Sequence, residues 1–155
     1  MNRFDYCFAH VVGLEGGYVN DPRDPGGETI YGITKRDHPD LWANGRPTLD
    51  QAQERYRAEY WNACRCDDLP TPFDLIVFDA AVNQGPVQAV MMLQKALGLT
   101  TDGRVGPLTI AACQTAGKEG PALVLTERAM RYVQTRNFDR FGRGWLKRLF
   151  LVAEA

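Results

Sequence analysis

A chain of 155 residues, of which 45% are hydrophobic and 24% charged, has room for one compact domain and not for a second independent core. The formal net charge of −1 gives no indication of whole-molecule attraction to nucleic acid. Basic residues gather between positions 128 and 148, where Asp139 is the only acidic residue; this is typical of a solvated helix face or of a surface that meets an anionic wall or membrane.

The N-terminal half is predicted to begin with an amphipathic helix that ends at Glu15, because apolar residues recur at helical spacing before it. Two Asp-Pro pairs follow and favour turns, and residues 29–33 favour a short strand in a small hairpin or ordered loop. A short helix is expected to start near Thr34. The capping box at 48–51 predicts a longer helix that ends at about Trp61.

The C-terminal half is predicted to consist of helices separated by glycine and proline. Residues 71–72 are expected to cap and begin an almost wholly apolar helix, which belongs in the middle of a domain. The Gly-Pro pair at 85–86 ends that helix and starts another, and Pro107 starts a further one. The longest helix is expected over about 120–141, and the glycines at 142–144 are expected to separate it from a last helix.

These elements predict one all-α domain over residues 1–155, with about eight helices and at most one small hairpin. The N-terminal residues lack a basic start and a long apolar run, so no signal peptide or transmembrane segment is expected. The four cysteines have neither the rhythm of a disulfide scaffold nor the spacing of a zinc motif. We therefore expect free thiols, no metal site and no cofactor.

The most informative window begins with Glu15-Gly16-Gly17-Tyr18 and continues through two Asp-Pro pairs and a double glycine to Thr34. A carboxylic acid that protonates a leaving group near neutral pH needs a rigid, partly desolvated position, which the end of a packed helix provides. The glycines allow the backbone to reverse and to approach a bulky ligand closely. A Glu before two glycines is also an ordinary helix end, so the catalytic interpretation depends on the whole window.

This window resembles the signature of glycoside hydrolase family 108, the muramidase-type endolysins of the lysozyme-like superfamily. The Phe-Asp-Ala-Ala-Val-Asn run at 78–83 and the Asp-Gly…Gly-Pro…Thr turn at 102–109 follow in the order expected of that family, and the resemblance covers nearly the full chain. It implies a lysozyme-like fold and hydrolysis of the β-1,4 bond between N-acetylmuramic acid and N-acetylglucosamine. The glycan strands of bacterial peptidoglycan are then the partner.

The same resemblance implies the catalytic residues. Glu15 is the general acid, Asp24 the second carboxylate and Thr29 the residue that positions the attacking water, in the order found in phage-type lysozymes. The gap from Glu15 to Thr29 is one residue shorter than in that pattern, and an Asp before a Pro is also a plain turn residue. Glycosidases usually employ two carboxyl groups, and Asp21 and Glu28 are the other nearby candidates.

Four further residues are singled out by type and position. Tyr18 and Tyr31 flank the acid and are expected to stack on sugar rings. Asp79 and Asn83 share one face of an apolar helix and so need partners or a cleft. We expect Asp79 to brace a neighbouring helix. For Asn83 a contact with a sugar N-acetyl or hydroxyl group is expected, the alternative being a cap for the helix break that follows it.

Residues 87–115 resemble the helix–turn–helix of small peptidoglycan-binding modules, which we interpret as scaffold inside the domain. Two other functions stay open: a lytic transglycosylase that uses Glu15 as acid and then base, and a non-catalytic peptidoglycan-binding protein. The chain is expected to be a monomer that inserts stably in no membrane and binds no nucleic acid. As an endolysin it would stay in the host cytoplasm until a holin or another export route released it to the periplasm and cell wall.

Overall fold

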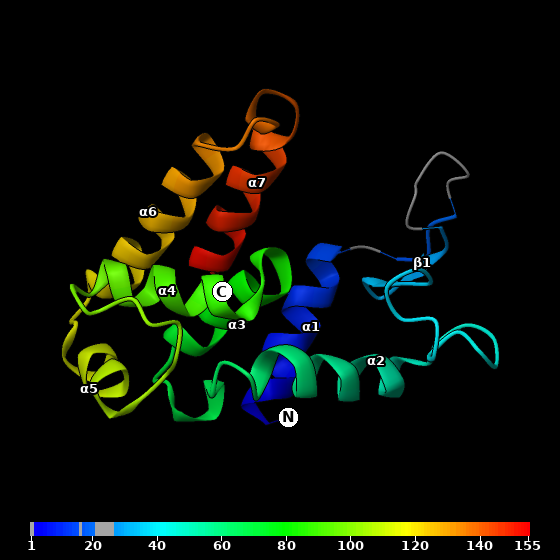
Figure 1. The fold of residues 1–155 in the computed structure, drawn as a ribbon, viewed down its shortest axis with the longest axis horizontal. Helices are drawn as coiled ribbons and strands as arrows, with labels where there is room; N and C mark the ends of the chain where they lie inside the picture. The colour runs from blue at the N-terminus through cyan, green and yellow to red at the C-terminus, as the bar shows by residue number, and fades with distance from the viewer. Residues whose placement is uncertain (1, 16, 21–26) are drawn as a thin grey trace. The chain divides into compact units, whose positions relative to one another are not determined.

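The computed structural model describes residues 2–15, 17–20 and 27–155, with the backbone alone for residues 14 and 15. This part of the chain forms seven α-helices, a π-helical turn, a 3-10 turn and one two-stranded hairpin, which confirms the all-α prediction with one small hairpin (Figure 1). Contacts divide the chain into two compact units, Met1–Ala58 and Glu59–Ala155, which are described in turn.

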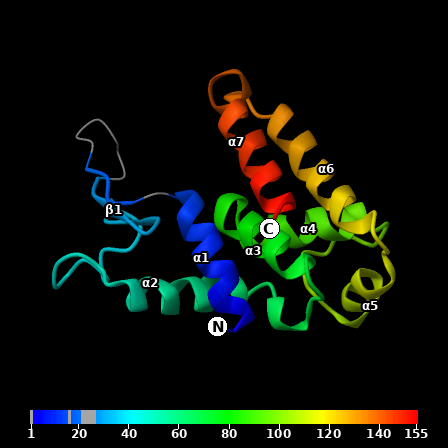
Figure 2. The same cartoon turned by 180° about the vertical axis from the view of Figure 1, so that it is seen from behind.

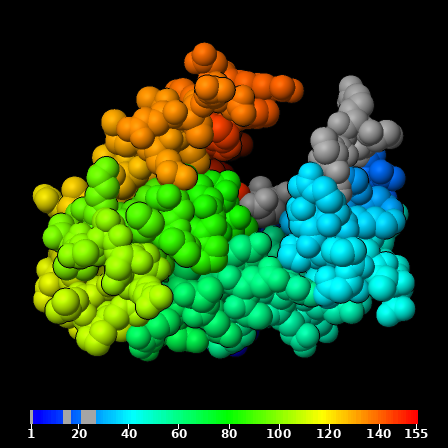
Figure 3. Space-filling view, in the orientation of Figure 1, coloured from blue at the N-terminus to red at the C-terminus, as the bar shows by residue number. Residues whose placement is uncertain are grey.

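The first unit contains two helices and the hairpin. Helix α1 (Arg3–Glu15) buries its apolar stripe, as the sequence spacing predicted. Strands β1 (Thr29–Ile30) and β2 (Ile33–Thr34) pair antiparallel, with Thr29 opposite Thr34 and Ile30 opposite Ile33. In the space-filling view, the hairpin and the residues that follow it in sequence, coloured cyan, form one continuous surface (Figure 3).

Helix α2 (Leu49–Tyr56) begins with the predicted capping box, in which the side chains of Thr48 and Gln51 each accept a hydrogen bond from the other's backbone N–H. The π-helical turn η1 (Arg57–Trp61) carries it on to the predicted end. The prediction of a short helix near Thr34 is wrong. The Thr34 hydroxyl and the Asp37 carboxylate close a turn there instead, because such side-chain bonds compete with helical backbone bonds.

The second unit is built around α3 (Phe73–Gln84), whose residues from Phe73 to Ala81 are all buried. It packs against three helices of the same unit: α4 (Pro86–Ala96), α6 (Gly120–Val133) and α7 (Phe138–Ala153). Helices α6 and α7 lie side by side in both ribbon views (Figures 1 and 2). The 3-10 turn η2 (Cys66–Asp68) precedes α3, and α5 (Pro107–Thr115) lies between α4 and α6 in the chain.

The ends of these helices follow the sequence in most places. Pro86 and Pro107 occupy the first turns of α4 and α5, as predicted. The predicted Thr71 cap is wrong: α3 starts after Pro72, and the Thr71 hydroxyl donates to the Asp74 carboxylate instead of capping the backbone. Helix α4 ends at Ala96, and Gly98 two residues further on adopts φ 70°, which lets the chain fold back so that the carbonyls of Gln94 and Lys95 accept hydrogen bonds.

The predicted helix break at Gly142 and Gly144 is also wrong. Helix α6 ends at Val133, and α7 begins at Phe138 and continues through both glycines. A glycine costs a helix only about 1 kcal/mol relative to alanine, so packing decides. Gly142 is buried, and a Cβ atom there would lie 2.6 Å from the Phe138 ring, which explains why the helix carries glycine at this contact.

The four cysteines are buried and form no disulfide, as the sequence spacing predicted. Burial raises the pKa of the Cys113 thiol to about 11, so that Cys113 is a neutral packing residue at physiological pH. None of the helices in the described part of the chain combines the length and the apolar character that crossing a membrane requires.

Candidate functional site

The predicted acid stands where the first helix ends. Helix α1 closes at Glu15, whose side chain lies outside the described residues, as do Asp21 and Asp24 entirely. Just beyond, Val19 and Thr29 exchange both backbone hydrogen bonds, with N···O distances of 2.9 Å and 2.9 Å. This bridge pairs the strand that carries Thr29 with Val19, four positions after the end of α1.

The turn of the hairpin holds Tyr31 in an unusual backbone conformation. Tyr31 and Gly32 link the strands with φ angles of 53° and 73°, the arrangement of a type I′ turn. Asn, Asp and Gly are the usual residues there, and an aromatic residue with positive φ costs about 1–3 kcal/mol. The Tyr56 hydroxyl of α2 donates to the Tyr31 carbonyl oxygen at 3.0 Å, which helps to hold this turn.

A cluster around Glu28 flanks the hairpin. Lys35 and the Tyr18 hydroxyl each donate to a different carboxylate oxygen of Glu28, both at 3.1 Å. The Arg46 guanidinium lies 3.8 Å from the centre of the Tyr18 ring. The hydrogen bonds from Lys35 and then Tyr18 lower the pKa of Glu28. This lowered pKa is the opposite of what a general acid needs, and it favours Glu28 as an ionised partner of Lys35.

Sequence reasoning named Glu28 as a candidate carboxylate and missed its partner. A two-residue turn at 31–32 places 28 opposite 35, so the pairing of Glu28 with Lys35 could have been read from the turn. Tyr18, Thr29 and Tyr31 are thus gathered around one hairpin in the first unit. Asn83, the remaining predicted site residue, belongs to the second unit.

In the second unit a buried ionic network fixes the C-terminal part of α3. Asp79 is fully buried and accepts hydrogen bonds from Arg128 of α6, at 2.8 Å, and from Arg148 of α7, at 2.9 Å. The prediction that Asp79 braces a neighbouring helix is confirmed. Nothing in the spacing of the sequence identified the two arginines, which are 49 and 69 positions away.

The network extends to Asn83. Arg128 donates to the Tyr132 hydroxyl at 3.3 Å, and that hydroxyl donates to the side-chain carbonyl oxygen of Asn83. Tyr132 also stacks on Trp145, with ring centres 5.1 Å apart. The amide NH₂ of Asn83 is left without a partner among the described residues. Asn83 does not cap the helix break, since the Gly85 N–H donates to the Ala81 carbonyl.

The described residues therefore offer hydroxyl, amide and aromatic groups suited to a carbohydrate. They include no group of three or more His, Cys, Asp or Glu side chains that could hold a metal ion. With its helices and single small hairpin, the fold is that of a lysozyme-like protein.

Comparisons with known proteins agree with this class. Residues 8–85 match the family described as Glycosyl hydrolase 108, and residues 88–150 match one described as Predicted Peptidoglycan domain. The solved structure of SagA from Brucella abortus is 35% identical with a TM-score of 0.83, over 97% of this chain and 91% of that chain. No curated protein matches the chain. The chain belongs to glycosyl hydrolase family 108, and it is a glycoside hydrolase that acts on peptidoglycan.

The two matched segments meet between α3 and α4. In the structure these two helices pack against each other, and both also pack against α6. The glycosidase segment therefore contributes its last helix to the core that the peptidoglycan-domain segment needs.

Proposed function

We propose that this chain is an N-acetylmuramidase that hydrolyses the β-1,4 bond between N-acetylmuramic acid and N-acetylglucosamine, with Glu15 as general acid. The observation that carries the proposal is the position of Glu15. It ends α1 four positions before Val19 of the Val19–Thr29 bridge, inside the segment that matches the glycosidase family.

In the proposed reaction Glu15 donates its proton to the glycosidic oxygen as the bond to the anomeric carbon breaks. Asp24 stabilises the positive charge that develops on the sugar, or activates the water. The Thr29 hydroxyl orients the water whose oxygen bonds to the anomeric carbon, and the water proton is passed to a carboxylate. Glu28 is not proposed as the acid, because its hydrogen bonds with Lys35 and Tyr18 lower its pKa.

Digestion of purified peptidoglycan, followed by mass analysis of the fragments, tests this reaction. A muramidase adds one water and leaves a reducing end on N-acetylmuramic acid. A lytic transglycosylase leaves an anhydro sugar that is lighter by one water, and a purely binding protein releases no fragments. Either of the last two results contradicts the proposal.

Substitution of Asp24 by asparagine is expected to lower turnover roughly 10²-fold with little change in thermal unfolding, because the amide keeps the turn-forming hydrogen bonds but loses the charge. The matched control is Asp21→Asn, the same change in the other Asp-Pro pair of this part of the sequence. Rates on peptidoglycan are measured for both. Equal, small effects would identify Asp24 as a turn residue.

The strained turn residue Tyr31 is proposed as a sugar contact, supported by its cost to the hairpin. Tyr31→Asn is expected to raise the unfolding free energy by about 0.5–1 kcal/mol, since asparagine tolerates positive φ, and to raise KM several-fold. Tyr31→Phe keeps the ring and serves as the control. If Tyr31→Asn is more stable but has an unchanged KM on soluble glycan fragments, Tyr31 does not contact the substrate.

Two further side chains, one from each unit, are proposed to contact the glycan. Tyr18, oriented by Glu28 and Arg46, stacks on a sugar ring. The amide NH₂ of Asn83, which has no partner among the described residues while Tyr132 holds the carbonyl oxygen, donates to an N-acetyl or hydroxyl oxygen. We further propose that residues 1–155 act as one lysozyme-like domain, because the glycosidase match over residues 8–85 spans the boundary between the two units. Residues 87–115 serve as scaffold in it, because α4 shares a core with α3.

The biological role is proposed from the resemblance to phage-type endolysins. In that role the chain acts as a monomer on the glycan strands of a host wall, and a holin or a comparable route gives it access from the cytoplasm. Lysis of cells that produce the protein only when a holin is produced with it would support this role, and lysis without any such partner would contradict the need for one.

A further inference from the structure

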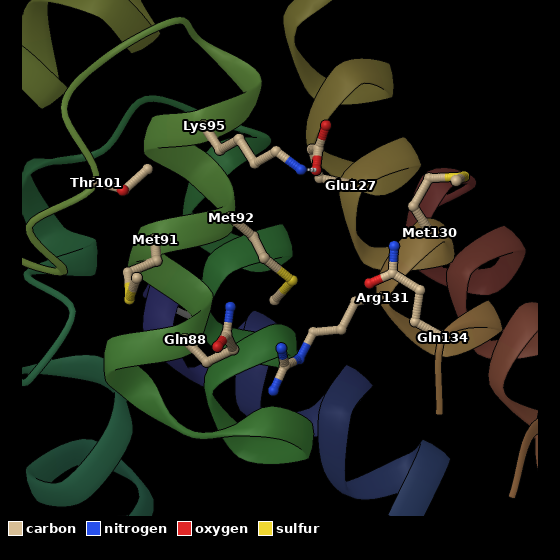
Figure 4. Close-up of a pocket in the computed structure, with 9 residues that line it drawn as sticks. All are labelled: Gln88, Met91, Met92, Lys95, Thr101, Glu127, Met130, Arg131 and Gln134. Atoms are coloured by element: carbon tan, nitrogen blue, oxygen red, sulfur yellow. Dashed lines mark ion pairs between the residues drawn. The ribbon is translucent and has the colours of Figure 1, made fainter. Parts of the chain in front are cut away.

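A groove lies between α4 and α6 in the second unit, inside the segment that matches the peptidoglycan domain (Figure 4). Its volume is about 170 Å³. Pockets that enclose a whole small molecule usually measure about 300–1,000 Å³. The groove therefore suits one end or side chain of an extended ligand that continues over the surface.

One wall of the groove carries a charge without a counter-ion. Lys95 of α4 reaches across to Glu127 of α6, with an Nζ–Oε2 distance of 2.7 Å. Arg131 lies one turn further along α6, and its guanidinium points across the groove towards Gln88 at the start of α4 (Figure 4). Arg131 is exposed and has no ion-pair or hydrogen-bond partner within the described ranges. It is thus available to a carboxylate, which a guanidinium can bind through two hydrogen bonds.

The remaining lining favours a peptide over a sugar. Amides from Gln88 and Gln134 can donate to and accept from a peptide backbone. Met91, Met92 and Met130 supply flexible apolar side chains of the kind found at adaptable binding surfaces. No aromatic ring is among the residues that line this groove, although ring stacking is the usual way to hold a sugar face.

We propose that this groove binds the stem peptide of peptidoglycan, with Arg131 on a stem carboxylate. Stem peptides carry carboxylates from glutamate and from the chain terminus, and amines on a diamino acid, which matches a groove with one free cation beside a Lys–Glu pair. The inference rests on the proposed function, because it takes peptidoglycan as the substrate. It adds a second point of recognition, which would make hydrolysis of the glycan depend on the peptide attached to it.

The test compares two soluble substrates: uncrosslinked glycan strands with their stem peptides, and the same strands after an amidase has removed the peptides. Arg131→Gln is expected to lower kcat/KM roughly 3- to 10-fold on the peptide-bearing strands and to leave the rate on stripped strands unchanged, as for loss of one exposed charged contact. The control is Arg136→Gln, an exposed arginine outside the groove. It should match the wild type on both substrates.

A binding measurement separates this inference from the proposed reaction. A free stem tetrapeptide is titrated into the full chain by calorimetry or NMR, and the affinity should fall in Arg131→Gln and not in Arg136→Gln. If the wild type cleaves neither substrate, the proposed function fails, while the titration still tests whether the groove binds the stem peptide. If Arg131→Gln loses the same factor in kcat/KM on peptide-bearing and stripped strands, Arg131 contacts the glycan and the inference is overturned. An unchanged affinity of Arg131→Gln for the tetrapeptide would also overturn it.

Discussion

Replacement of Glu15 by glutamine is expected to reduce the rate of glycan hydrolysis about 10²–10⁴-fold, the usual contribution of a positioned general acid. The amide has nearly the same shape as the carboxyl group but has no acidic proton to give to the leaving oxygen. The substitution leaves the backbone hydrogen bonds of α1 unchanged and keeps the size of the side chain at its end. Thermal unfolding should therefore stay close to that of the wild type.

The chain offers a matched control for this experiment in Glu28→Gln. It is the same chemical change in a carboxylate 13 positions further along the chain, and Lys35 and Tyr18 donate hydrogen bonds that lower the pKa of Glu28. We expect Glu28→Gln to change activity far less than Glu15→Gln. If Glu15→Gln retains more than a few per cent of wild-type activity, the general acid is a different residue.

The parts of the fold that could be predicted from the sequence are those set by neighbouring residues. The capping box before α2 and the Gly85-Pro86 pair between α3 and α4 act within a single turn of the chain, and both are found where expected. Helix α3 was predicted to be central because it is apolar on all sides, and a helix of that kind is stable only when covered. Local rules and simple burial therefore account for most of the helical framework.

The errors arise where a distant or side-chain contact outweighs a local preference. Thr34 and Asp37 bond to each other rather than starting a helix. Gly142 stays inside α7 because the Phe138 ring packs on it, and no local rule states what packs against a glycine. In each case the decisive contact becomes visible only when the side chains are placed.

The candidate site, too, could be predicted from the sequence only in part. Tyr18, Thr29 and Tyr31 could be selected from one short window, since they flank the predicted acid in sequence. The hydroxyl that orients Asn83 comes from Tyr132, 49 positions away, and helical spacing alone gives no reason to pair them. Only the polar character of Asp79 and Asn83 on an apolar helix signalled that partners had to exist. The identity of those partners depends on how α6 and α7 pack on α3.

Asp79→Asn is accordingly expected to cost the chain about 3–5 kcal/mol of unfolding free energy, the effect of removing one partner from a buried ion pair. Arg128 is fully buried, and its Nε and Nη1 atoms have no hydrogen-bond partner among the described residues. The buried positive charge of Arg128 is therefore balanced by Asp79. Urea unfolding at constant pH measures the loss as a lower midpoint with an unchanged slope. The matched control is Asp68→Asn, which breaks the exposed pair with Arg65 and should cost about 1 kcal/mol or less. Equal losses in the two variants would show that burial of the Asp79 network contributes nothing beyond an ordinary surface pair.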